Sequence, residues 1–379
     1  MKITCGLFLL SALVVSFAFS SYAQSNPTYT VLVGTYTDKT SSKGIYAFEF
    51  NSETGKLTPK GLAAQSTNPS WAAIHPDGKF AYAANESGEA SMVSAFSLDS
   101  ATGKLTLLNQ VPALGEDPCY LAFDKTGKYL FAANYTSGTV TAFPILPDGK
   151  LGRHSALVKD AGTLGPNKQR QEGSHAHWVQ VSPDNRSLYV SDLGLDEIVS
   201  YPFDPVKGYL RPNGSPFAKP APGSGPRHSV FSADNKFLYV LSEIKSTITV
   251  FSGADGKPPL RSLQAVSTLP ASYNGRKEAA EIAIHPSGKW LFASNRGYDS
   301  IAVFSIDPQK GTLTPAGIFP TGGKEPRHFA LDPTGQFLLA ENQFSNSIVV
   351  FRINTATGAL TQVSQTADIP SPVCLVFVP

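Results

Sequence analysis

Charged residues are scarce in this chain, and neither sign dominates. They make up 16% of the 379 residues, and the formal net charge is +2. This balance removes any general electrostatic case for binding nucleic acid. No run of like charges suggests attachment to a membrane surface either. Hydrophobic residues make up 41%, and the 32 Gly and 29 Pro residues are typical of a core-forming fold with many turns.

Cysteine is almost absent. Cys5 precedes an apolar segment and is not placed like the cysteine of a lipoprotein. Cys119 and Cys374 are too far apart in the sequence to indicate a metal site, although an exported protein could oxidise them. We therefore expect two free, mostly buried thiols.

The first 23 residues differ from the rest and predict a secretory signal peptide. Lys2 precedes an apolar run from Ile3 to Phe19, and residues 21–23 (Ser-Tyr-Ala) carry small residues at the positions a signal peptidase requires for a cut before Gln24. The run is short for a membrane span, and no later stretch is long and apolar enough to be one. We expect residues 24–379 to form the mature, exported protein, periplasmic or secreted, and free of the membrane after cleavage.

A segment of about 20 residues recurs through the chain. Its first copies are NPSWAAIHPDGKFAYAANES and DPCYLAFDKTGKYLFAANYT, and the six copies span residues 68–87, 117–136, 174–194, 225–244, 279–297 and 325–344. Each contains a short apolar strand, a tight turn with Gly or Asn, and a second β-rich strand. Two weaker strands follow, so each repeat predicts a four-stranded antiparallel blade. Repeats of about 40–50 residues built this way are typical of a β-propeller.

A seventh blade is divided between the two ends of the chain. Residues 29–37, 44–50 and 55–61 predict three of its strands, and residues 371–379 predict its innermost strand. The fold class expected is therefore an all-β, seven-bladed β-propeller with no helical domain. Its ring would be closed by the C-terminal strand, which leaves no exposed sheet edge.

Two sets of equivalent positions border the same mouth of such a propeller. The innermost strand starts with Ser70, Cys119, His177, Arg227, Ala280, Arg327 and Val373, and continues with Trp71, Tyr120, Trp178, His228, Glu281, His328 and Cys374. The second strand ends with Thr35, Asn85, Asn134, Asp192, Ser242, Asn295 and Asn342, and the next residues are Tyr36, Glu86, Tyr135, Leu193, Glu243, Arg296 and Gln343.

The polar residue that ends the second strand occurs in every blade, which favours an architectural role in binding the turn backbone. Convergence of Glu86, Asn134, Asp192 and Asn295 on a calcium ion is the alternative. The other positions vary, and charged residues gather at them in blades four to seven: His177, Arg227, Glu243, Glu281, Arg296 and Arg327. Arginines at one opening indicate an anion site, with acid–base groups beside them. A purely structural ring of ion pairs is the alternative.

The remaining histidines divide by position. His75 and His285 lie in the HPxGK turns, where we expect structural roles. His154 lies on an outer loop and carries no sign of a site. His175 and His177 form an HxH pair that could ligate zinc, but the sequence shows no third ligand.

Four segments at these positions resemble the propeller-type lactonase family, which contains the bacterial 6-phosphogluconolactonases and the fungal carboxy-muconate lactonizing enzymes. The segments are HAHWVQVSPDNRSLYVSDLGLDEI, GPRHSVFSADNKFLYVLSE, EIAIHPSGKWLFASNRG and EPRHFALDPTGQFLLAEN. The resemblance spans residues 28–379 and includes VGTYT at 33–37. It implies a metal-independent site for an acidic lactone that contains His177 (with His175 as the second choice), Arg227, Glu243 and Arg296.

The leading hypothesis is hydrolysis of a sugar-type lactone, with 6-phosphogluconolactone as the family's reference substrate. Arg227, Arg296 and Arg327 would hold the anionic group or the developing oxyanion. Glu243 or His177 would be the general base. Further contacts with the substrate are predicted for His175, His228, Glu281, His328 and Asn342.

No cofactor is expected, because three arginines around one opening would repel a divalent ion. A small-molecule lactone is the expected partner, and the sequence leaves the oligomeric state open. A lactonizing or ring-opening isomerase would use the same positions. A non-catalytic exported propeller that binds a partner through its face is the hypothesis from another class. An exported chain would not meet a cytosolic sugar phosphate, so the substrate is the least transferable part of the resemblance.

Overall fold

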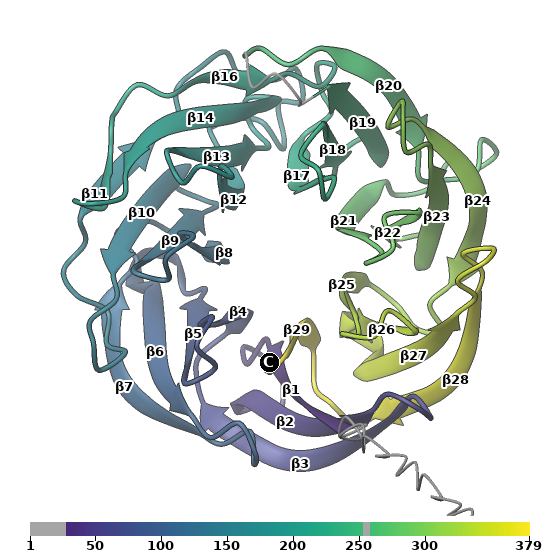
Figure 1. The fold of residues 1–379 in the computed structure, drawn as a ribbon, viewed down its shortest axis with the longest axis horizontal. Helices are drawn as coiled ribbons and strands as arrows, with labels where there is room; N and C mark the ends of the chain where they lie inside the picture. The colour runs from purple at the N-terminus through teal and green to yellow at the C-terminus, as the bar shows by residue number, and fades with distance from the viewer. Residues whose placement is uncertain (1–27, 253–257) are drawn as a thin grey trace, which may run out of the picture.

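The computed structural model describes residues 28–252 and 258–379. The predicted signal peptide lies outside the described residues. Seven antiparallel sheets are arranged around a central axis (Figure 1), which confirms the predicted seven-bladed propeller. Within the described ranges no helix is both long and apolar enough to cross a membrane.

The blades are named in chain order, with the strands given from the axis outward. Blade 1 contains β29 (Pro372–Phe377), β1 (Thr28–Thr35), β2 (Gly44–Asn51) and β3 (Lys56–Gln65). Blade 2 contains β4 (Pro69–Ile74), β5 (Phe80–Asn85), β6 (Met92–Leu98) and β7 (Leu105–Pro112). Blade 3 contains β8 (Pro118–Phe123), β9 (Tyr129–Asn134), β10 (Thr139–Pro144) and β11 (Ala156–Lys159). Blade 4 contains β12 (Ala176–Val181), β13 (Ser187–Asp192), β14 (Glu197–Asp204), β15 (Tyr209–Leu210) and β16 (Ser215–Ala218).

The last three blades keep the same order. Blade 5 contains β17 (Pro226–Phe231), β18 (Phe237–Ser242), β19 (Thr247–Ser252) and β20 (Ser262–Ser267). Blade 6 contains β21 (Glu278–Ile284), β22 (Trp290–Arg296), β23 (Ser300–Ile306) and β24 (Leu313–Pro320). Blade 7 contains β25 (Pro326–Leu331), β26 (Phe337–Asn342), β27 (Ser347–Ile353) and β28 (Leu360–Ala367).

Blade 1 is closed by the two ends of the chain, as the sequence predicts. β29 pairs antiparallel with β1, with Leu375 opposite Val33 and Phe377 opposite Val31. In Figure 1 the yellow β29 lies on the axial side of the purple β1. The C-terminal segment therefore supplies the missing innermost strand.

Blade 4 differs from the expected four strands. β15 and β16 both pair with β14, so the outer edge of this sheet is made of two short strands. The only helical segments described are the 3₁₀ turns η1 (Gly88–Ala90) and η2 (Gln343–Ser345). Both follow the second strand of their blade and lie outside the sheets.

The hydrophobic core is divided into seven clusters, and each lies between two neighbouring blades. The cluster between blades 7 and 1, for example, joins Phe337 and Ile348 to Phe50 and Leu375. Both faces of every sheet are therefore buried against a neighbour. This explains why second strands such as β5, β9 and β18 are almost continuously apolar and buried.

The two histidines of the HPxGK turns link neighbouring blades. Nε2 of His75 lies 2.9 Å from the carbonyl oxygen of Gly127 in the equivalent turn of blade 3. Nε2 of His285 lies 2.7 Å from the carbonyl oxygen of Gly335 in blade 7. The structural role predicted for both side chains is confirmed.

The polar residues that end the second strands also bind backbone. Nδ2 of Asn295 donates to the carbonyl of Thr268 at 3.0 Å, and Nδ2 of Asn342 donates to the carbonyl of Thr321 at 3.2 Å. Asp192 accepts hydrogen bonds from the backbone N–H groups of His175 and Leu195. These contacts support the architectural interpretation of this position.

Candidate functional site

A cavity of about 230 Å³ opens at the mouth of the ring. It is lined by side chains from all seven blades and from the connection between blades 3 and 4: Tyr36, Glu86, Asp117, Cys119, Tyr135, Thr136, Arg170, His177, Glu243, Arg296 and Arg327. The sequence comparison placed the starts of the first strands and the ends of the second strands at one opening, and most of these residues come from those positions.

A bulge-like interruption of the β-ladder occurs at the second residue of the innermost strand in blades 4, 5 and 7. In blade 5 the ladder passes from Pro226 to His228, which leaves Arg227 without a partner opposite it. The equivalent interruption occurs around His177 in blade 4 and around Arg327 in blade 7. A bulge changes the direction of a side chain. Successive residues such as Arg227 and His228 can therefore both be directed into the centre of the ring.

Glu243 is the centre of the charge network. Its carboxylate lies 3.0 Å from Nε of Arg227 and 2.8 Å from Nη2 of Arg296, and it also binds Nη2 of Arg170. Burial alone would raise the pKa of Glu243, but the three guanidinium groups hold that pKa well below its usual range. Glu243 is therefore ionised, and both of its oxygens are occupied by cations.

Arg227 lies behind the cavity wall. Its side chain is 3% exposed, and Nη1 donates to the carbonyl of Ala280 and approaches Nε2 of His228 at 3.2 Å. Burial, together with Arg296 and Arg327, lowers the pKa of Arg227 to about 10. It remains charged at neutral pH, but it reaches the cavity only through Glu243.

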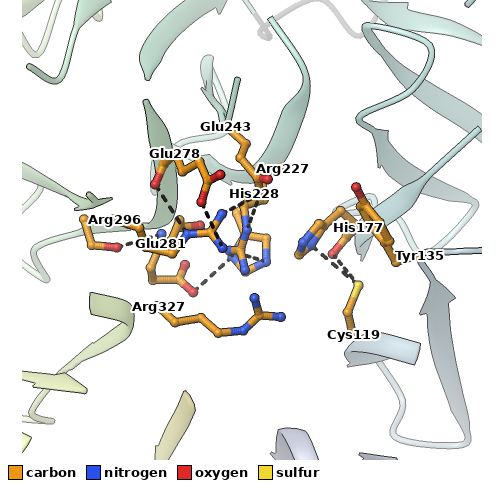
Figure 2. Close-up of polar contacts among 12 residues, drawn as sticks. Cys119, Tyr135, His177, Arg227, His228, Glu243, Glu278, Glu281, Arg296 and Arg327 are labelled. Carbon is orange, nitrogen blue, oxygen red and sulfur yellow. Dashed lines mark hydrogen bonds and ion pairs between the residues drawn. The ribbon is translucent and has the colours of Figure 1, made fainter. Parts of the chain in front are cut away.

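His177 lines the cavity as a neutral imidazole. Burial lowers the pKa of His177 well below its usual value, and the positive charge of Arg227 lowers it further. Nδ1 lies 3.6 Å from Sγ of Cys119, and Nε2 has no hydrogen-bond partner among the described residues. Burial raises the pKa of the Cys119 thiol, so this cysteine is a neutral neighbour of the imidazole. Figure 2 shows Arg227 and His228 between His177 on one side and Arg296 on the other.

Arg327 is the cavity arginine with the weakest attachment to a protein anion. Nη2 lies 3.7 Å from Glu86, and the guanidinium lies 5.4 Å from the centre of the Tyr36 ring. The Tyr36 hydroxyl donates to Glu86 at 2.8 Å. An anionic ligand would compete with only one long ion pair for this guanidinium.

Several residues predicted to contact the substrate lie behind the cavity. Nδ1 of His228 is 3.0 Å from Glu281, Nε2 of His328 is 3.5 Å from the same carboxylate, and Nδ1 of His328 is 2.6 Å from Glu341. This buried chain lies next to Arg227 and does not line the cavity. His228 links this chain to Arg227, whose Nη1 lies 3.2 Å from Nε2 of His228.

His175 and Asn342 are also placed away from the cavity. Nδ1 of His175 lies 3.0 Å from the carbonyl of Tyr135, Nε2 lies 3.1 Å from Glu172, and the ring stacks on Tyr135. Asn342 is fully buried and bound to the backbone. His175 therefore supports the Tyr135 ring, and the HxH pair does not present two nitrogens to one point. No group of three His, Cys, Asp or Glu side chains suited to a metal occurs in the described parts of the chain.

Both remaining cysteines are free and buried, as predicted. Arg170 is the main site residue that the sequence comparison missed. It lies between β11 and β12, in residues 160–175, and so has no equivalent in the repeat. Its guanidinium contacts Glu243 and donates to the Tyr135 hydroxyl at 3.2 Å. The length of that connection was the available signal.

A family model described as "Lactonase, 7-bladed beta-propeller" matches residues 30–377. The chain belongs to this lactonase family. The family assignment made from the sequence is therefore confirmed.

Individual lactonase-family proteins support the assignment. A 6-phosphogluconolactonase of Bacillus subtilis is 33% identical over 285 residues, which is 75% of this chain and 80% of that protein. The crystal structure of a candidate 6-phosphogluconolactonase from Bacteroides fragilis gives a TM-score of 0.87 at 39% identity and covers 94% of this chain and 100% of that one. A periplasmic gluconolactonase of Pseudomonas aeruginosa gives a TM-score of 0.86 at 32% identity, with coverage of 93% and 99%.

Proposed function

We propose that this lactonase-family protein hydrolyses a sugar-type lactone in the cavity at the mouth of the ring. The observation that carries the proposal is a neutral histidine, His177, in one cavity with three arginine side chains, Arg170, Arg296 and Arg327. Relatives named 6-phosphogluconolactonase and gluconolactonase support a sugar lactone as the substrate class.

Ester hydrolysis needs a base, a site for the oxyanion and a proton for the leaving oxygen. His177 takes a proton from water as the water attacks the lactone carbonyl carbon. Arg327 or Arg170 donates to the oxyanion that forms, and the other holds an acidic substituent. The C–O bond of the ring then breaks, and the imidazolium returns the proton to the ring oxygen, which becomes a hydroxyl. The product acid releases one proton to solvent.

His177 is a better candidate for the base than Glu243. A carboxylate held by three guanidinium groups is weakly basic, whereas a neutral imidazole has a free electron pair. Glu243 would instead fix the directions of Arg170 and Arg296, and Arg227 would fix Glu243. Arg227 is thus proposed as a positioning residue that does not touch the substrate.

The test is proton release from a panel of acidic and neutral aldonolactones with the purified protein. Turnover of at least one sugar-type lactone, faster than its hydrolysis in buffer, is expected. An absence of turnover across the panel would contradict the proposal and favour a non-catalytic propeller. Formation of a lactone from an open-chain acid, without hydrolysis, would favour the lactonizing isomerase.

Catalysis is proposed to proceed without a metal. Of the four groups of the calcium alternative, Asn134, Asp192 and Asn295 are fully buried and bound within the protein, and only Glu86 lines the cavity. Lactonase activity should therefore be unchanged after exhaustive treatment with a chelator. Activity that disappears with the chelator and returns with calcium would overturn this part of the proposal.

Export is proposed from the signal peptide predicted at residues 1–23, and the periplasmic gluconolactonase among the structural neighbours supports it. N-terminal sequencing of the protein recovered from outside the cytoplasm should begin at Gln24. Recovery in the cytoplasm with an intact Met1 would contradict export. An exported enzyme would meet non-phosphorylated lactones rather than a cytosolic sugar phosphate.

A further inference from the structure

A groove beside the catalytic cavity is a second feature of the same mouth. Its volume is about 610 Å³, and it lies where blade 1 meets blade 7. Tyr36 lines both the groove and the cavity of His177. The cavity and the groove are therefore neighbours on either side of Tyr36.

Two departures from the blade repeat build this groove. Residues 36–43 connect β1 to β2, whereas the corresponding connections in blades 3, 4, 5 and 7 have four residues each (135–138, 193–196, 243–246 and 343–346). Asp38, Lys39, Thr40 and Ser41 of the longer connection form one wall. The opposite wall comes from η2 of blade 7.

Phe344 in η2 is the second departure. The equivalent residue, two positions after the second strand's polar end, is Thr37, Ser87, Thr136, Gly194, Ile244 or Gly297 in the other blades. Phe344 is 65% exposed, more than any other aromatic side chain described. It lines the groove, and its ring has no aromatic partner among the described residues. Single exposed apolar residues are common, but this one faces a cavity that adjoins the catalytic site.

Three polar side chains of the groove are available to a ligand. Lys39, Ser41 and Gln343 make no side-chain hydrogen bond or ion pair within the part of the chain that the structure describes. An exposed aromatic face with several neutral donors and acceptors suits a sugar ring, whose C–H face packs on an aromatic ring while its hydroxyls form hydrogen bonds. A phosphate would be less suited, because Lys39 is the only cation in the groove lining and Asp38 lies next to it.

We propose that the groove is a subsite for a second sugar ring, so that the preferred substrate is a disaccharide aldonolactone. Its lactone ring would lie in the cavity with His177, and its glycosyl substituent would pack on Phe344. This inference rests on the proposed lactone hydrolysis and specifies its substrate class. The subsite would contribute binding energy that a monosaccharide lactone cannot use.

The experiment compares three lactones, glucono-1,5-lactone, cellobiono-1,5-lactone and 6-phosphogluconolactone, with the parent protein and with Phe344→Ala. The parent should show the highest kcat/KM on the cellobionolactone. Because one aromatic contact contributes about 0.5–1.5 kcal/mol, Phe344→Ala should lower that kcat/KM by roughly 2–10-fold and leave the value for gluconolactone unchanged. Phe344→Trp keeps an aromatic side chain and should retain the preference for the disaccharide lactone.

Leu107→Ala is the matched control, because Leu107 is 52% exposed on β7 at the outer edge of blade 2. It should change none of the three values. Equal loss on mono- and disaccharide lactones in Phe344→Ala, or no preference for the disaccharide in the parent, would overturn the subsite while lactone hydrolysis stands. A preference for 6-phosphogluconolactone that is lost in Lys39→Met would assign the groove to a phosphate instead. If the protein hydrolyses none of the three lactones, the subsite is refuted together with the activity on which it rests.

Discussion

Replacement of His177 by alanine is expected to lower kcat for lactone hydrolysis by a factor of about 10²–10⁴, the usual contribution of a general base. His177 is the neutral imidazole of the cavity, and its Nε2 has no hydrogen-bond partner among the described residues. KM should change little, since the arginines that hold the anion remain. The measurement is steady-state turnover of the best lactone from the panel.

The pH profile provides a readout that loss of packing would not give. Because the neutral imidazole is the active form and its pKa is lowered, kcat/KM of the parent should fall only below the usual pKa of histidine, near 6.5. In His177→Ala that acid limb should be absent. An unchanged acid limb in the variant, or a kcat within a factor of two of the parent, would rule out His177 as the base.

Glu243→Gln serves as the comparison for a group that positions others. It removes the charge that neutralises Arg170, Arg227 and Arg296. Breaking such a buried network costs about 3–5 kcal/mol of stability, so this variant should unfold at lower denaturant concentration, whereas His177→Ala should not show that loss. Activity lost in Glu243→Gln without a change in stability, and retained in His177→Ala, would transfer the role of base to Glu243.

Removal of residues 371–379 is expected to prevent stable folding. The deletion eliminates β29, the innermost strand of blade 1, and with it the buried side chains of Val373, Cys374 and Leu375. Each fully buried apolar side chain contributes about 1.5–3 kcal/mol, against a total stability of about 5–15 kcal/mol for a typical protein. The deletion also exposes the unpaired edge of β1, which promotes aggregation.

The truncated protein is to be compared with the parent by thermal unfolding and size-exclusion chromatography. Deletion of Pro379 alone is the control, because this residue is exposed and lies beyond β29. A synthetic peptide of residues 371–379 should partly restore soluble protein if closure of the ring is the cause. If the truncated protein is a monomer and unfolds at the same temperature as the parent, closure of the ring by β29 does not contribute to stability.

The fold was predictable because the repeat expresses local rules at every copy. Apolar strands and Gly- or Asn-containing turns recur at fixed spacing, so each blade is specified by its own sequence. The split blade followed from the count of strands. The addition of β16 to blade 4 did not follow, because short outer strands such as those of that sheet have little periodicity.

The site was only partly predictable. Residues that depart from the repeat, His177, Glu243, Arg296 and Arg327, were found in the sequence and line one cavity. The residues at the next position of the innermost strands, His228, Glu281 and His328, depart from the repeat as strongly but lie behind the cavity. A repeat comparison gives the position along a strand. It does not give the depth of a side chain within the ring, because the bulges redirect successive residues.

The sequence by itself determined the seven blades, the closure by residues 371–379 and the opening at which the charged residues gather. The tertiary structure decided which charges meet. Arg170 joins Glu243 from a connection 73 residues away in the sequence, and Glu243 is thereby a bound anion rather than a free base. The physical reason is that the pKa and availability of a buried group depend on the few charges within several ångströms of it, and those neighbours come from different blades.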